Sequence, residues 1–360
     1  MTSKLAGAHR GAVTLLVRAG TTMIAAVIVL VLGTGATPTG ALVRVNSGRG
    51  YQFNSPSALA LSSGKLFVAN YAGNSVTELE ASTGALVRVI SRPADRFRYP
   101  AAMATIGGKL FVANYGRPGS VTELKAATGA VVRVIGGPSY KFNGPDALAL
   151  DGDRLFVANS GNKSVTEVNV SNGALVRVIS GPRYDLDTPD ALAVGAGKLF
   201  VANTVLGQSS VTVLDAGTGA LVRVMSGQGY AFNSPDALAL SGGKLFVADL
   251  GPPDAVTELI AATGQLVRVI SGPAYEFNFP VAIVLDGGKL FVANKYGSLL
   301  TEVDASTGAL VKAFSGSPYG FRFPAAMALD GDKLFVANSG AGSVTEINAS
   351  TGALVRVLSD

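Results

Sequence analysis

The stretch that decides the fold runs from Pro145 to Val178 and reads PDALALDGDRLFVANSGNKSVTEVNVSNGALVRV. Gly, Asn, Asp or Pro residues separate it into short segments, most of them rich in β-branched or aromatic residues. The segments are Asp146–Leu150, Arg154–Asn159, Ser164–Val168 and Ala174–Val178. Each is too short for a helix with a period of 3.6 residues, so the stretch predicts four β-strands.

The same unit recurs along nearly the whole chain. Its central string, Leu-Phe-Val-Ala-Asn, occurs seven times at intervals of 44 to 46 residues, with Asp in place of Asn in one copy. The phenylalanines of the seven copies are Phe67, Phe111, Phe156, Phe200, Phe246, Phe291 and Phe335. Four strands in each of seven units predict an all-β fold, a seven-bladed β-propeller of four-stranded antiparallel blades.

The segment from Pro145 to Val168 resembles the YVTN-type β-propeller repeat, and it is similar to the NHL repeat. The resemblance covers about residues 39–357. It implies the propeller fold. It does not imply one activity, because such repeats serve cell-surface proteins, binding scaffolds and several enzymes.

Residues 1–36 have the order of a secretory signal peptide. They contain Lys4, Arg10 and Arg18 and no acidic residue, and an apolar run follows at Thr21–Leu32, before small residues up to Ala36. The run is short for a membrane span, which needs about 20 residues. We therefore predict a cleaved signal peptide at 1–36, with a retained anchor as the alternative, and a secreted or cell-surface location.

The strand Gly-Ala-Leu-Val-Arg-Val occurs, in close variants, eight times, one more than seven blades require. The first copy is at Thr39–Val45 and the last at Thr351–Val357. We expect the last copy to close the seventh blade, because a local hairpin has the smaller loop-closure entropy. Residues 37–50 are then a lead with a spare outer strand, which could pair with the sheet edge of another chain, and residues 51–360 form the propeller.

Composition excludes several kinds of chemistry. The chain has no Cys or Trp, and its one histidine, His9, lies in the predicted signal peptide. The mature chain would therefore lack Ser-His-Asp and Cys-His catalysis, Cys/His zinc sites and disulfides. Three of the cations behind the net charge of +5 also lie in residues 1–36, and no dense basic run follows. We predict no nucleic-acid partner.

The loop between blades has the form S-G-P-x-Y-x-F-N-x-P and supplies a ring of tyrosines. Tyr140, Tyr184 and Tyr230 are candidate ligand-binding residues, because Tyr combines apolar area with a polar tip. The alternative is that these rings pack between neighbouring blades.

Carboxylates recur beside the expected central channel. Asp146, Asp190 and Asp236 follow the proline that begins the innermost strand, and Asp249 replaces the usual Asn of the repeat. All four are candidate ligand-binding residues. The first three are also candidate ligands for Ca²⁺, which prefers six to eight oxygens. The alternative is that each Asp caps its own turn.

A Glu of the third strand and an Arg of the fourth fall opposite each other in most repeats, as in Glu258 and Arg268. We interpret them as exposed cross-strand ion pairs. In one repeat Val213 faces Arg223.

Three functions remain open. The first is a secreted or cell-surface, monomeric, non-enzymatic binding scaffold for an unknown protein or carbohydrate, without cofactor, that touches the membrane only if residues 1–36 are retained. Its support is the near-uniformity of the repeats. The second is a hydrolase similar to the Ca²⁺-dependent lactonase and gluconolactonase group, using the acidic cluster with Ca²⁺ as cofactor. The third is a structural protein whose spare strand joins neighbouring molecules.

Overall fold

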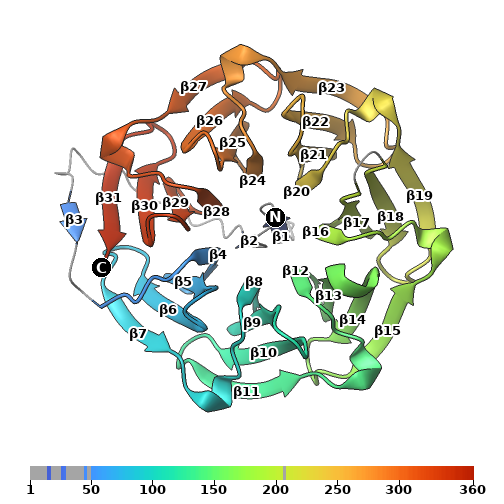
Figure 1. Ribbon diagram of the computed structural model, residues 1–360, viewed down its shortest axis with the longest axis horizontal. Helices are drawn as coiled ribbons and strands as arrows, with labels where there is room; N and C mark the ends of the chain where they lie inside the picture. Colours follow the sequence, from blue (N-terminus) through green and yellow to red (C-terminus); the bar gives the residue numbers. More distant parts are fainter. Residues whose placement is uncertain (1–13, 18–25, 30–43, 47–49, 206–207) are drawn as a thin grey trace, which may run out of the picture.

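The computed structural model describes residues 14–17, 26–29, 44–46, 50–205 and 208–360. Seven blades stand in a ring, and each contains four consecutive antiparallel strands (Figure 1). This confirms the predicted all-β, seven-bladed propeller. The blades follow one another along the chain, so each repeat of the sequence folds into one blade.

The first strand of every blade faces the centre of the ring and is almost wholly buried. Each begins at the proline of its repeat. These strands are β4 (Pro56–Ser62), β8 (Pro100–Ile106), β12 (Pro145–Asp151), β16 (Pro189–Gly195), β20 (Pro235–Ser241), β24 (Pro280–Asp286) and β28 (Pro324–Asp330).

The second strand contains the Leu-Phe-Val-Ala-Asn string, whose phenylalanine is buried in every blade. Because blades cover both of its faces, it is apolar throughout rather than alternating. These strands are β5 (Lys65–Asn70), β9 (Lys109–Asn114), β13 (Arg154–Asn159), β17 (Lys198–Asn203), β21 (Lys244–Asp249), β25 (Lys289–Asn294) and β29 (Lys333–Asn338).

The third strands are β6 (Ser75–Glu80), β10 (Ser120–Lys125), β14 (Ser164–Asn169), β18 (Ser210–Asp215), β22 (Ala255–Ile260), β26 (Leu299–Asp304) and β30 (Ser343–Asn348). The outer strands, which form the rim, are β7 (Leu86–Ile90), β11 (Ala130–Ile135), β15 (Leu175–Ser180), β19 (Leu221–Ser226), β23 (Leu266–Ser271), β27 (Leu310–Phe314) and β31 (Leu354–Ser359).

Short 3₁₀ helices lie between the outer strand of one blade and the first strand of the next. They are η1 (Pro93–Asp95), η2 (Pro138–Tyr140), η4 (Pro182–Tyr184), η5 (Gln228–Tyr230), η6 (Pro273–Tyr275) and η7 (Ser317–Tyr319). A further one, η3 (Ser160–Asn162), lies inside blade 3.

The C-terminal copy of the repeated strand closes the ring. β31 pairs antiparallel with β30, as the shorter loop favours. The carboxylate of Asp360 accepts hydrogen bonds from the backbone N–H groups of Gln52 and Phe53, at 3.2 and 2.9 Å. Arg356 donates to the carbonyl of Ser82 at 3.0 Å. Blade 7 is thereby joined to blade 1.

The N-terminal copy of the same strand gives β3 (Arg44–Asn46), which lies outside β31 and pairs with it in parallel (Figure 1). β1 (Thr14–Val17) and β2 (Ala26–Val29) pair with each other near the centre of the ring. The predicted signal peptide, residues 1–36, otherwise lies outside the described residues and stays a prediction. Within the described part of the chain, no helix is long and apolar enough to cross a membrane.

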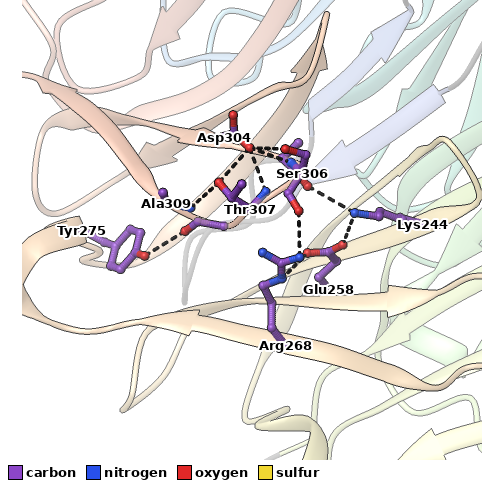
Figure 2. Close-up of polar contacts among 10 residues, drawn as sticks. Lys244, Glu258, Arg268, Tyr275, Asp304, Ser306, Thr307 and Ala309 are labelled. Carbon is purple, nitrogen blue, oxygen red and sulfur yellow. Dashed lines mark hydrogen bonds and ion pairs between the residues drawn. The ribbon is translucent and has the colours of Figure 1, made fainter.

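In most blades a buried glutamate of the third strand pairs with a cation of the same blade, and the outer-strand arginine also donates to the next blade. In blade 5, Glu258 lies 2.6 Å from Lys244 Nζ and 2.9 Å from Arg268 Nε (Figure 2). Arg268 also donates to the carbonyl of Ser306 in blade 6 at 2.8 Å. Glu258 is fully buried. The interpretation of these pairs as exposed is therefore wrong, because the turn of the next blade covers the carboxylate.

Candidate functional site on the entry face

We use the term entry face for the side of the ring at which the first strands begin. It carries the loops between blades and the loops between second and third strands, since Pro145 pairs with Asn159 and Asn159 with Ser164. The 1–2 and 3–4 turns lie on the opposite face. The predicted ligand-binding tyrosines and aspartates both belong to loops or strand ends on the entry face.

Two of the three candidate tyrosines contact the next blade through their hydroxyl groups. Tyr140 Oη donates to the carbonyl of Gly173 at 2.9 Å, and Tyr230 Oη donates to that of Gly264 at 3.2 Å. The ring of Tyr184 is buried, and its hydroxyl accepts a hydrogen bond from Arg183 at 2.5 Å. These rings lie between blades, and their role in ligand binding stays a prediction.

Asp146, Asp190 and Asp236 lie inside the ring wall rather than on its surface. All three are buried, each in a bulge at the start of its first strand. Asp236 faces the buried Lys295 of blade 6, whose pKa is lowered by burial and partly restored by the Asp236 charge. Within the described residues, no group of three acidic or other metal-ligating side chains converges closely enough to hold a metal ion.

Asp249 is a buried carboxyl of the entry face with a strongly raised pKa. Its Oδ1 accepts hydrogen bonds from the backbone N–H groups of Asn233 and Ser234, at 2.8 and 2.7 Å. Its Oδ2 is buried without a hydrogen-bond partner among the described residues. Burial raises the pKa of Asp249 to about 7, and the neighbouring Asp254 charge acts in the same direction.

Elsewhere in the ring this position is Asn, and its amide nitrogen donates to the threonine of the third strand, as in Asn203 to Thr212 at 3.0 Å. In blade 5 the corresponding Thr257 hydroxyl donates to the carbonyl of Tyr230 at 2.8 Å. Only a protonated Asp249 can supply the hydrogen that the Asn amide supplies in the other blades. The site therefore favours a neutral carboxyl.

One further set of aromatic residues on the entry face was not predicted from the sequence. They occupy the position just before the proline of the first strand, where Tyr99, Phe279 and Phe323 replace the Ser, Gly or Thr of the other repeats. All three have a positive φ, between 50° and 59°. Tyr99 is 42% exposed and Phe323 38%. The signal in the sequence is an aromatic residue where the other repeats have a small one.

These aromatic residues form two clusters with tyrosines of neighbouring loops. In the first, the ring of Tyr71 stacks on that of Tyr99, with centroids 5.1 Å apart. In the second, Tyr296 lies 4.5 Å from Phe279 and 5.9 Å from Phe323. Tyr296 is 50% exposed. The clusters lie at the junctions of blades 1 and 2 and of blades 6 and 7.

These observations define a repeat-built β-propeller with one chemically distinct face, on which aromatic clusters and buried carboxylates interrupt the uniform repeat. The chain belongs to the family described as outer membrane protein assembly factor BamB, whose model matches residues 39–268 and 207–357. A search of curated proteins finds no match.

Solved structures show the same fold at low identity. One from Kuenenia stuttgartiensis hydrazine synthase is 17% identical, with a TM-score of 0.68 over 85% of this chain and 99% of the other. The computationally designed protein Ika8 is 15% identical, with a TM-score of 0.60 over 83% and 97%. BamB from Moraxella catarrhalis is 15% identical, with a TM-score of 0.53 over 79% and 81%. The resemblance of the repeat to the YVTN and NHL types stays a prediction.

Proposed function

We propose that this chain is a non-enzymatic binding scaffold that acts outside the cytoplasm and binds a protein partner on its entry face. The description of its family names an assembly factor for outer membrane proteins, which supports both a protein partner and this location. Residues 1–36, with their cations and apolar run, support export. Fusion of these residues to a reporter that is active only after export tests the location.

One observation carries the proposal: Tyr99 and Phe323 expose their rings while their backbones hold a conformation that bulky residues rarely adopt. The positive φ is shared by Ser55, Gly144 and Thr188 at the same position, so what is unusual is a bulky side chain there, at a cost on the order of 1–3 kcal/mol. Exposed aromatic residues are also the side chains that most often anchor protein interfaces. Packing does not account for them, because other blades place Gly144 or Ser55 at the same position.

The binding test uses a photo-crosslinking amino acid in the full-length chain, expressed in its native host. We place it at Tyr296, in the second cluster, and at Val311 on the rim as a control, because Val311 is 51% exposed. We expect a discrete protein adduct from position 296 and not from 311. Equal adducts at both positions contradict a specific entry-face site. An adduct that protease does not shorten identifies a glycan and overturns the protein partner.

The substitution Phe323→Gly tests the role of this ring in binding, with little expected change in stability. Gly144 already occupies this position in blade 3 with a φ of +60°, so the substitution relieves strain while removing one aromatic contact. We expect the free energy of unfolding to change by less than about 1 kcal/mol and the adduct from position 296 to be lost. An unchanged adduct would show that Phe323 takes no part in binding.

A further inference from the structure

A cavity of about 510 Å³ opens on the entry face between blades 5 and 6. Its acidic lining residues are Asp254 and Glu276, and its apolar lining includes Phe277, Leu299 and prolines. Five of the other repeats have Ser in place of Leu299, and one has Ala. The cavity therefore combines two carboxylates with apolar walls at one junction of the ring.

Asp254 is held in place by the backbone. It accepts hydrogen bonds from the backbone N–H groups of Phe279 and Gly251. Asn74 holds the same position in blade 1, where its Oδ1 accepts from the N–H of Tyr99 at 2.7 Å. Asp254 thus places a charged carboxylate where blade 1 has a neutral amide that makes the same backbone contact. Its charge is not needed for this backbone contact.

One oxygen of this carboxylate lacks a partner. Asp254 Oδ1 is buried without a hydrogen-bond partner among the described residues. Burial also raises the pKa of Asp254, since the site supplies too little stabilisation for its charge. A cation bound in the cavity beside Asp254 would stabilise this charge. Glu276, exposed in the left-handed cap of η6, adds a second negative charge at the cavity.

The apolar walls of the cavity favour a basic side chain over a metal ion. Phe277, Leu299 and Pro273 suit the alkyl stem of a basic side chain better than a bare metal ion, which prefers a shell of oxygens. The N–H of Phe279 binds Asp254 directly, so the cavity adjoins the second aromatic cluster. Residues of an extended peptide lie about 3.3 Å apart, so neighbours of a bound Arg or Lys would reach these rings.

We propose that this cavity binds an Arg or Lys side chain of an extended partner segment, whose adjacent apolar or aromatic residues contact Phe279, Tyr296 and Phe323. The proposal rests on the proposed function, and it names the chemistry of the partner. We favour Arg over Lys, because a guanidinium carries several N–H donors and its stem can cover the apolar wall.

The test measures peptide binding to the full-length protein by calorimetry. The probes are acetyl-Phe-Arg-Phe-amide and the same peptide with citrulline, which has nearly the shape of Arg without its charge. We expect the Arg peptide to bind at least about fivefold more tightly. Asp254→Asn and Glu276→Gln should each remove most of this preference. Asp185→Asn, at the same cap position in η4, is the matched control and should leave it unchanged.

Equal affinity for the two peptides overturns the proposal, as does an Arg preference that survives both acidic substitutions. Absence of binding at roughly 10 mM peptide overturns it as well. Asp254→Asn keeps the backbone contact that Asn74 makes in blade 1, so loss of folding does not confuse the result. The crosslink at position 296 is measured separately from the Arg preference of the cavity. Equal affinity of the wild-type protein for the two peptides, together with an adduct at position 296, therefore rejects the cavity and keeps the binding face.

Discussion

Asp249 makes the stability of the fold depend on pH. Its folded pKa of about 7 lies above that of the unfolded chain, so the folded state binds the proton more tightly. The contribution of this proton to stability is complete at acidic pH and is lost as pH rises through about 7. Asp249→Asn supplies a permanent N–H donor in its place, as Asn203 does in blade 4.

We therefore expect the variant to gain stability over the wild type by about 2–3 kcal/mol between about pH 5 and pH 8. Denaturant unfolding across this range measures the difference between the two proteins. Asp151→Asn, at an exposed aspartate, serves as the control. A constant difference between Asp249→Asn and wild type at all pH values would show that Asp249 stays charged in the folded protein.

Calcium is expected to leave thermal unfolding unchanged. Asp146, Asp190 and Asp236 are buried in the walls of three different blades, and Lys295 already faces Asp236. Ca²⁺ requires six to eight oxygens, which these positions do not bring together. Thermal scans with millimolar Ca²⁺ and with excess chelator test this. A rise in the midpoint that is abolished by changing all three residues to Asn would restore the calcium hypothesis.

At the residue scale the sequence indicates which positions are unusual, but not which way they face. The recurrence of Asp after proline is visible in the sequence, whereas its burial depends on the bulge and on the next blade. Tyr140 shows the same limit, because its partner, Gly173, belongs to the turn of the following repeat. Tyr99 is visible as an aromatic residue in place of a small one. The sequence reveals neither its positive φ nor its exposure.

At the scale of elements, the contribution of the ion pairs within a blade to stability depends on burial. Glu258 receives two cations and is covered by the turn around Ser306 (Figure 2). Glu258→Gln leaves Lys244 and Arg268 without the charge they face. We expect it to cost about 1–3 kcal/mol of unfolding free energy in denaturant titrations.

The matched control is Glu80→Gln. Glu80 pairs with Lys65 but keeps 40% of its side chain exposed, so its loss should cost less than about 0.5 kcal/mol. Equal costs for the two substitutions would show that burial adds nothing to the pair at Glu258.

The strands themselves were predictable because each repeat supplies the same four apolar segments between turn residues. The burial of the glutamates was not. A cross-strand pattern places Glu258 opposite Arg268 within one blade, but the covering turn comes from the next blade. Blade 4 shows that the pair is dispensable at one junction, because Val213 is buried beside Arg223 there and Arg223 still donates to the carbonyl of Ala262 at 2.9 Å.

At the scale of the whole molecule, the ring is uniform on its opposite face and irregular on its entry face. The cavity at blades 5 and 6, the cluster at blades 6 and 7 and the cluster at blades 1 and 2 all replace a small or polar residue of the repeat by a larger or charged one. A uniform scaffold with local substitutions on one face suits a binding function, because the repeats supply rigidity and the loops supply specificity.

The two ends of the chain contribute differently to closure of the ring. The last blade takes all four of its strands from residues 324–359, and β3 only adds a fifth strand at its edge. Deletion of residues 1–49 removes β1, β2 and β3 but none of the four strands of any blade, so it should shift the thermal midpoint by only a few degrees, about 2–4 °C for each 1 kcal/mol lost. Deletion of residues 353–360 removes β31, the Arg356 contact and the Asp360 bonds to blade 1. This opens the ring, and we expect it to abolish the cooperative transition seen by circular dichroism. A cooperative transition that survives the C-terminal deletion, but not the N-terminal one, would show that the first copy of the repeated strand closes the propeller instead.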